Sequence, residues 1–249
     1  MNILERAKPG AMTGLLRLVF LLGLVAVAPA RAQEAPPLYD VELIVFEQIN
    51  GPGDEARPLA ESRPPVTDAW NPAEAAGLAP TLPASAEAAR SLPESAFRLD
   101  TQAARLARGR AYRVLLHTAW RQPGLPREEA FQVRLRAGDE MGARLEAAAK
   151  NTADNYWTVR ESMWIPDTPV FELDGTVTIS LSRYLHAHFD LALTEVGTDE
   201  TEDMGSIPQL ISHRLKQHRR MRSERLHYID HPRLGVLIEI FPVEDEAQS

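Results

Sequence analysis

Residues 171–194 read FELDGTVTISLSRYLHAHFDLALT, and this stretch decides the fold. Apolar side chains recur at every second position, and the positions between them are mostly polar or charged. A period of two places one set on each face of an extended chain, so the stretch predicts β-structure with one buried face. It is longer than a typical strand, which predicts a bend, a bulge or two strands. Asp174-Gly175 is a candidate for a tight hairpin turn.

Further strands are expected on both sides of this stretch. Residues 39–46 become apolar on both faces, which is typical of an interior strand of a sheet. The other strands are expected at 111–121, at 131–135 (joined through Pro123-Gly124), and in a final hairpin formed by 225–229 and 235–241.

Three helices are predicted. The first spans 99–108, with Asp100 as N-cap and Gly109 as its end, and the second spans 138–150. The third spans 206–215, because Ser206-Ile-Pro-Gln209 resembles a capping box with proline in the first turn. Strands outnumber helices and are mostly joined by hairpins. The sequence therefore predicts an α+β fold, a mainly antiparallel sheet with helices packed on one face.

The N-terminus has the features of a secretory signal peptide. A basic segment precedes the apolar run 18–28, and Ala30-Arg-Ala32 fits the small-x-small pattern that signal peptidase cleaves. The run is shorter than the roughly 20 apolar residues needed to span a bilayer. We expect residues 1–32 to be removed and residues 33–249 to form one domain with no membrane span, located outside the cytoplasm. The alternative is an uncleaved N-terminal anchor.

A proline-rich segment interrupts the pattern at residues 51–95. It holds eight of the nineteen prolines, mixed with Ala, Glu and Ser. Proline removes backbone donors and blocks regular pairing, so we expect an irregular loop with short helical turns near 71–76 and 85–90. So long a loop in a compact domain is either functional or mobile.

Composition excludes several classes of function. The chain has no cysteine, which excludes disulfides, thiolate metal sites, a cysteine nucleophile and lipidation at an N-terminal cysteine. Loss of the leader removes four basic residues and one acidic residue, so the net charge changes from −8 to −11. Such a surface repels nucleic acid and anionic lipid. Signatures of serine hydrolases and phosphate-binding loops are also missing from the sequence.

Four segments stand out along the chain. They are YDVELIVFE (39–47), HTAWRQ (117–122), LDGTVTISLSRYLH (173–186) and RRMRSERLHYIDHP (219–232), the last followed by GVLI (235–238). Together they resemble the CsiV family of periplasmic peptidoglycan-binding proteins, and the location in the periplasm is what this resemblance implies. The resemblance implies a non-enzymatic role in cell-wall assembly, without a cofactor. It implies two partners: peptidoglycan, and an outer-membrane lipoprotein that activates a class A penicillin-binding protein. The resemblance does not identify any ligand-contact residues.

A basic cluster between 213 and 225 departs most sharply from the acidic average. Arginine can bind a carboxylate through two parallel hydrogen bonds, and peptidoglycan stem peptides end in carboxylates. Arg219, Arg220 and Arg222 are therefore candidate ligand-binding residues. The alternative is a solvated helix face that pairs with the acidic segment 195–203.

Two other groups of side chains are weaker candidates. His186 and His188 share one strand face with Asp190, at a spacing that allows both rings to reach one zinc ion, although no HExxH motif accompanies them. Hydrogen bonding across strands is the alternative. Trp120, Tyr184 and Tyr228 are candidates for stacking on sugar rings; the alternative is that they fill the core or its rim.

The sequence therefore favours a periplasmic protein that binds peptidoglycan or its synthesis machinery without turning over a substrate. Two alternatives stay open. One is a metal-dependent envelope hydrolase that uses His186 and His188. The other is a pure protein–protein adaptor that uses the 51–95 loop or a sheet edge.

Overall fold

The computed structural model describes residues 35–53, 56–65, 69–72, 89–152, 156–201 and 205–244. All of these residues except Ala35 belong to one compact unit, Pro36–Ser249. The expected signal peptide and most of the expected helical turns at 71–76 and 85–90 lie outside the described residues.

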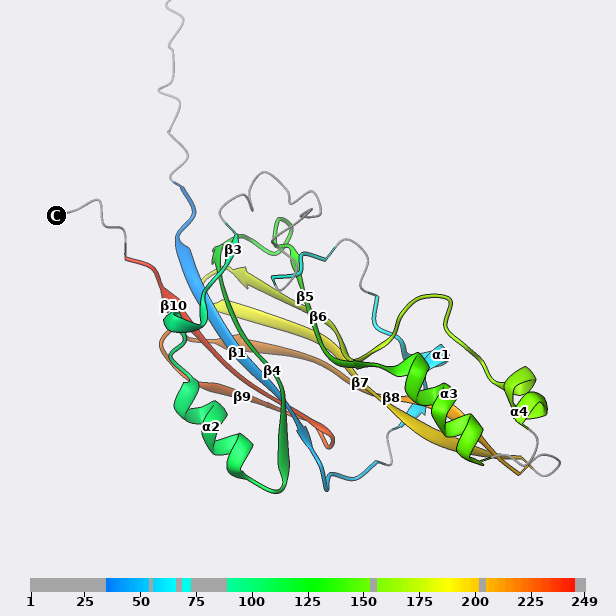
Figure 1. Cartoon of the computed structure of the whole chain (residues 1–249). Coiled ribbons are helices and arrows are strands. Elements are labelled where there is room, and N and C mark those ends of the chain that lie inside the picture. The colour runs from blue at the N-terminus through cyan, green and yellow to red at the C-terminus, as the bar shows by residue number, and fades with distance from the viewer. Residues whose placement is uncertain are drawn as a thin grey trace, which may run out of the picture. The chain divides into compact units, whose positions relative to one another are not determined.

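Two five-stranded sheets make up the fold, and all pairings between their strands are antiparallel (Figure 1). Sheet A has the order β3 (Arg90–Ser91), β4 (Tyr112–Pro123), β1 (Leu38–Gln48), β10 (Leu234–Pro242), β9 (His227–Asp230). Sheet B has the order β2 (Arg57–Pro58), β8 (Gly205–Met221), β7 (Leu185–Thr201), β6 (Phe171–Leu181), β5 (Gln132–Glu140). The expected antiparallel β-structure, the interior position of β1 and the final hairpin are confirmed.

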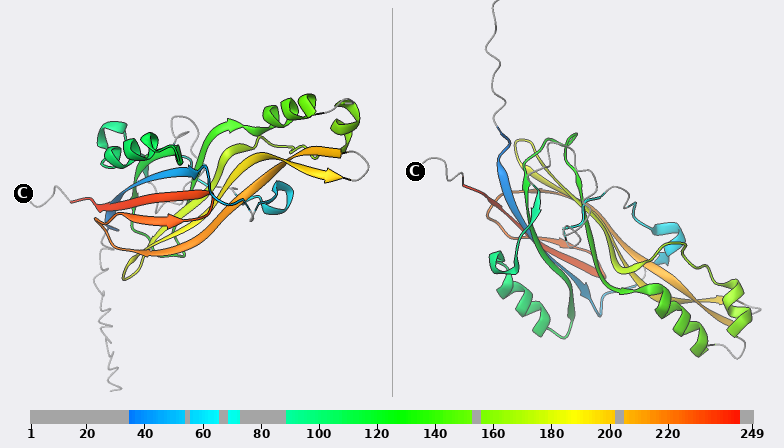
Figure 2. Two further views of the ribbon diagram at one scale, coloured as in Figure 1. Left: turned by 90° about the horizontal axis from the view of Figure 1, so that it is seen from below. Right: turned by 45° about the horizontal axis from the view of Figure 1, so that its top comes forward.

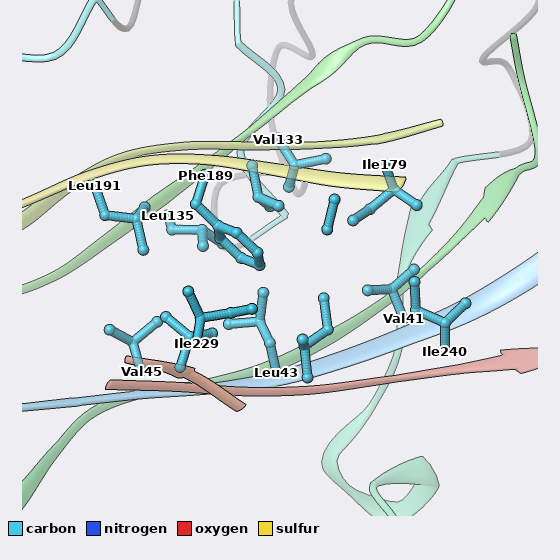
Figure 3. Packing of buried hydrophobic residues seen from close by; sticks show 14 of the residues in the cluster. Val41, Leu43, Val45, Val133, Leu135, Ile179, Phe189, Leu191, Ile229 and Ile240 are labelled. Atoms are coloured by element: carbon cyan, nitrogen blue, oxygen red, sulfur yellow. The ribbon is translucent and has the colours of Figure 1, made fainter. Parts of the chain in front are cut away.

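The two sheets pack through the faces that the period-two pattern makes apolar. Val41, Leu43 and Val45 of β1 share a hydrophobic core with Phe189 and Leu191 of β7. Figure 3 shows these side chains interdigitating between the strands of the two sheets. Burial of both inner faces at once is the main reason why the sheets associate.

A second core lies where β7 and β8 continue beyond sheet A (Figure 2). Here Ile207 and Leu210 of β8 pack with Leu145 and Met163. The helices that cover this extension are α1 (Leu59–Ser62), α3 (Met141–Thr152) and α4 (Tyr156–Ser162). The expected helix at 138–150 is thus confirmed as α3.

Helix α2 (Asp100–Arg108) contacts sheet A instead, on the face opposite the shared core. The carboxylate of Glu42 in β1 accepts hydrogen bonds from the N–H groups of Arg98 and Leu99, just before the helix. The expected helix and its end at Gly109 are confirmed, but the N-cap is Leu99 rather than Asp100. A short 3₁₀ helix, η2 (Glu94–Ala96), precedes it. Because α2 contacts sheet A and α3 contacts sheet B, the arrangement of helices on one face of a single sheet is not confirmed.

The helix predicted at 206–215 is wrong, because these residues belong to β8. The strand pairs with β7 along its whole length, from Gly205 opposite Thr201 to Met221 opposite Leu185. Pro208 is tolerated because β2 pairs only with Ile211 and Ser212, so β8 has an open edge at Pro208. Local capping signals are weak compared with the many contacts of this hairpin.

The hairpin turn predicted at Asp174-Gly175 is also wrong. Gly175 lies within β6, opposite Leu135 on one side and Leu191 on the other. Its φ is 152°, and an added Cβ would lie 2.2 Å from the Asp190 carbonyl oxygen. Glycine is needed here for a close strand approach. The turn between β6 and β7 falls at 182–184, so the long β-stretch is two strands, as one of the expected alternatives had it.

Pro123-Gly124 joins β4 to β5, as expected, but this connection passes from sheet A to sheet B rather than forming a hairpin. The Gly124 N–H donates to the Pro37 carbonyl oxygen, and the Leu181 N–H donates to the Leu125 carbonyl oxygen. The connection therefore ties the beginning of β1 to the end of β6.

Candidate functional site

A hollow of about 420 Å³ lies where the β6–β7 turn meets the end of β8 and the beginning of β1. We call it the basic hollow. Its floor is apolar and its rim carries three arginines; the lining residues are Tyr39, Leu181, Arg183, Tyr184, Leu185, Met221, Arg222, Ser223 and Arg225. Side chains from both sheets thus meet at this end of the sandwich.

Tyr184 organises part of the rim. Its ring lies 4.8 Å from the guanidinium carbon of Arg220 and 5.6 Å from that of Arg183. Contacts of this kind orient a guanidinium while leaving its N–H groups available for hydrogen bonding. Arg220 and Tyr184 come from β8 and the β6–β7 turn, so the pairing between β7 and β8 brings them together.

The turn between β8 and β9 fixes the other arginines of the rim. The Arg222 N–H donates to Nε2 of His227 at 3.3 Å, and the Glu224 N–H donates to the Ile240 carbonyl oxygen at 2.8 Å. Glu224 has a φ of 55°, which is the left-handed conformation of a tight turn. Arg222 and Arg225 are thus carried on a turn that is anchored to the neighbouring strands.

Several arginines gather at this end of the molecule without carboxylate partners. Many arginines elsewhere pair with carboxylates, namely Arg113, Arg121, Arg134, Arg160, Arg214 and Arg233. Within the described ranges, no carboxylate forms an ion pair with any of the arginines at or near the hollow, which are Arg183, Arg219, Arg220, Arg222 and Arg225. In a protein of net negative charge, this set is available to an external anion.

The structure separates the sequence candidates. Arg222 and Tyr184 line the hollow, and Arg220 joins them through its contact with Tyr184. Arg219 is exposed and lies on the strand face of Met221, opposite that of Arg220, but it is not among the residues that line the hollow.

Trp120 does not reach the surface. Its side chain is 0% exposed within the core, and its Nε1–H donates to Oε1 of Gln122. The suggestion that Trp120 stacks on a sugar is therefore wrong, and the alternative of a core residue holds.

Two other residues of the hollow were missed. Sequence reasoning did not identify Arg183 as a ligand-binding residue. The Arg183-Tyr184 pair in the turn between two strands is a sequence signal that could have found it. Tyr39 stands at the beginning of β1, and only the packing of the two sheets shows that it reaches the hollow.

The three imidazoles of His186, His188 and His218 lie together on the outer face of sheet B. His186 Nδ1 and His218 Nε2 are 3.0 Å apart, and the ring of His218 stacks on that of His188 with centroids 4.2 Å apart. Burial, then Arg127 and the neighbouring imidazoles, lower the pKa of His188 to about 4.

Across the part of the chain that the structure describes, no group of three or more His, Asp or Glu side chains is arranged to hold a metal ion. The metal-dependent hydrolase therefore has no site in those residues. No helix there combines the length and the apolar character needed to cross a membrane.

A network of ion pairs holds the two sheets together away from the hollow. Arg113 of β4 bonds to Glu47 of β1 and to Glu172 of β6, and so links sheet A to sheet B. Arg233 links Glu47 to Glu195 of β7 in the same way. The pKa of Glu195 is lowered by His213, whose Nε2 lies 3.8 Å away, and by Arg233. These arginines therefore stabilise the packing of the two sheets, and their charge is already paired.

The chain matches the family described as "Peptidoglycan-binding protein, CsiV" over residues 15–243. The match covers nearly the whole sequence, so this protein belongs to the CsiV family of peptidoglycan-binding proteins. The resemblance carried by the four segments is confirmed. No curated protein and no solved structure matches the chain.

Proposed function

We propose that this protein is a non-enzymatic periplasmic protein that binds peptidoglycan through the carboxylates of its stem peptides, at the basic hollow. The observation that carries the proposal is the clustering of several arginines at one end of an acidic protein, where none of them pairs with a carboxylate of the described residues. Membership of a peptidoglycan-binding family supports the ligand class.

The chemistry of the hollow suits a peptide carboxylate. A guanidinium can donate two parallel N–H bonds to the two oxygens of a carboxylate, and such charge-assisted bonds are among the strongest that a surface can make. The apolar floor formed by Leu181, Leu185 and Met221 offers contact to the methyl groups and methylene chains of a stem peptide.

The proposed cellular role combines the expected location with the family resemblance. The expected leader supports a location in the periplasm. We place it in cell-wall assembly, with a partner in the outer-membrane lipoprotein that activates a class A penicillin-binding protein.

Co-sedimentation of the mature protein with purified sacculi tests the proposal. The double variant Arg183→Ala/Arg222→Ala should bind at least about tenfold more weakly, because each lost charge-assisted bond contributes roughly 1.5–3 kcal/mol. The matched control is Arg105→Ala/Arg108→Ala, which removes the same charge from the exposed end of α2. Binding should also weaken as salt is raised. Equal sedimentation of both double variants and the wild type would overturn the assignment of the hollow.

A second candidate is the adaptor function, and one observation favours it. Trp157 in α4 and Trp164 just after it are 73% and 49% exposed, and exposed tryptophans are enriched at protein interfaces. A Trp157→Ala/Trp164→Ala variant that loses capture of the purified lipoprotein but still sediments with sacculi supports an adaptor surface separate from the hollow.

A further inference from the structure

Three aromatic rings form a row across the outer face of sheet A. Tyr112 comes from β4, Phe46 from β1 and Tyr228 from β9. The Phe46 ring meets Tyr112 edge-on, with centroids 5.4 Å apart, and lies nearly parallel to Tyr228, with centroids 6.1 Å apart. We call these three residues the aromatic row.

The row is exposed at its two ends. Tyr112 is 39% exposed and Tyr228 is 44% exposed, whereas Phe46 between them is 3% exposed. Phe46 fits because Gly235 lies opposite it in β10, where an added Cβ would be 2.2 Å from the ring. The glycine lets the central ring lie flat on the sheet and support the two tyrosines.

Polar groups border the row and hold its ring positions. The Tyr228 hydroxyl donates to Oδ1 of Asp230 at 2.5 Å. The Gln48 amide nitrogen donates to the same Oδ1 at 3.1 Å and to the His231 carbonyl oxygen at 2.6 Å. Among the described residues, no donor reaches Oδ2 of Asp230, and none reaches Oε1 of Gln48. Two acceptors therefore stand beside the exposed rings.

This combination matches a sugar better than a peptide or an anion. The apolar C–H face of a pyranose can cover a tyrosine ring, while its hydroxyl and amide groups need hydrogen-bond acceptors at the edge. Carboxylate Asp230 disfavours an anionic ligand. The rings are held by packing and hydrogen bonds, so little side-chain entropy is lost when they bind.

From this geometry we infer that the aromatic row binds the glycan strand of peptidoglycan, by stacking N-acetylated sugar rings on Tyr228 and Tyr112. The inference rests on the peptidoglycan binding proposed above, and it adds a second, uncharged contact. Tyr112 and Tyr228 are not among the residues that line the basic hollow. One molecule would thus hold a sugar strand and a stem peptide at different places.

Chitotetraose provides a probe that has N-acetylated sugars but no peptide and no carboxylate. Titration calorimetry should show binding by the wild type that changes little with salt. Tyr112→Ala/Tyr228→Ala should weaken it at least tenfold, and Tyr228→Phe should keep most of it because the stacking face remains. Arg183→Ala/Arg222→Ala should leave it unchanged. Absence of chitotetraose binding by the wild type, or equal binding by the double tyrosine variant, overturns the inference.

The two proposals fail in different ways. If sacculus binding depends on the arginines while chitotetraose does not bind, the sugar-binding role of the aromatic row is wrong and the assignment of the hollow is supported. If chitotetraose binds through the tyrosines while sacculus binding does not depend on the arginines, the assignment of the hollow is wrong and the sugar-binding role of the aromatic row is supported. Tyr228→Leu, which keeps apolar cover over Phe46, serves as a second variant if the alanine substitutions impair folding.

Discussion

Gly175 illustrates how a single residue can fix the spacing of two strands. Its Cα lies so close to β7 that any Cβ would overlap the Asp190 carbonyl oxygen and the Leu191 Cα. Its backbone also has a φ that other residues rarely adopt. Both constraints act in the same direction, because each alone disfavours a side chain.

Gly175→Ala should therefore lower the free energy of unfolding by about 2–3 kcal/mol, combining backbone strain with displacement of β7. Urea denaturation followed by circular dichroism measures this. Gly142→Ala in α3 is the matched control, since its Cβ would meet only the flexible Glu140 carboxylate and alanine favours a helix. A stability of the Gly175 variant equal to wild type would contradict the close approach of β6 and β7.

Residue types were a partial guide to the candidate site. Arg222 and Tyr184 could be predicted, because arginine suits carboxylates and an aromatic residue near a strand end suits stacking. Trp120 has the same local signal as Tyr184, and only the burial of its ring in the core separates them. Tyr228 was a candidate, but its partners Phe46 and Tyr112 lie far apart in sequence and meet only across the strands of sheet A.

Strand β8 is the element for which local and long-range signals disagree. Its first residues resemble a capped helix, and the strand exists because each residue pairs with β7 and because α3 covers part of it. Strands β1, β6 and β7 were predictable for the opposite reason. Their period of two is long, regular and matched to the buried face.

Ser212 distinguishes a strand from a helix at this position. It is 1% exposed and lies opposite Thr194, whereas the predicted helix would turn it towards solvent. Ser212→Lys should lower the free energy of unfolding by about 2–4 kcal/mol, because it buries a charge without a partner. Ser212→Ala should differ from wild type by less than about 0.5 kcal/mol, since the hydroxyl has no hydrogen-bond partner among the described residues. Equal stability of the two variants in urea denaturation argues for a solvent-facing position.

The whole molecule depends on how its two sheets are held face to face. The apolar faces alone do not set their alignment, and Arg113 adds a directional link between Glu47 of sheet A and Glu172 of sheet B. Both carboxylates are largely buried, so the loss of their cation leaves charge without compensation. This two-sheet arrangement was not predictable, because alternation identifies the buried face of a strand but not which sheet the strand joins.

Arg113→Met should lower the free energy of unfolding by about 2–3 kcal/mol, less than for a fully buried pair because Arg113 itself is partly exposed. Arg160→Met is the matched control. Its pair with Glu146 is partly exposed on both sides, 38% and 33%, so its loss should destabilise the protein much less. Thermal and urea denaturation of both variants provide the comparison, and equal losses would show that the link between the sheets is no stronger than a surface pair.

The position of β1 also bears on when the protein can fold. This strand lies between β4 and β10, so the centre of sheet A joins opposite ends of the described chain. Contacts between such distant segments form slowly, because a large loop must close before they stabilise anything. Sheet A therefore cannot be completed until the last strand has been synthesised. Until β10 is present, sheet A stays incomplete beside β1, and an incomplete sheet is easier to keep unfolded for passage through a translocation channel.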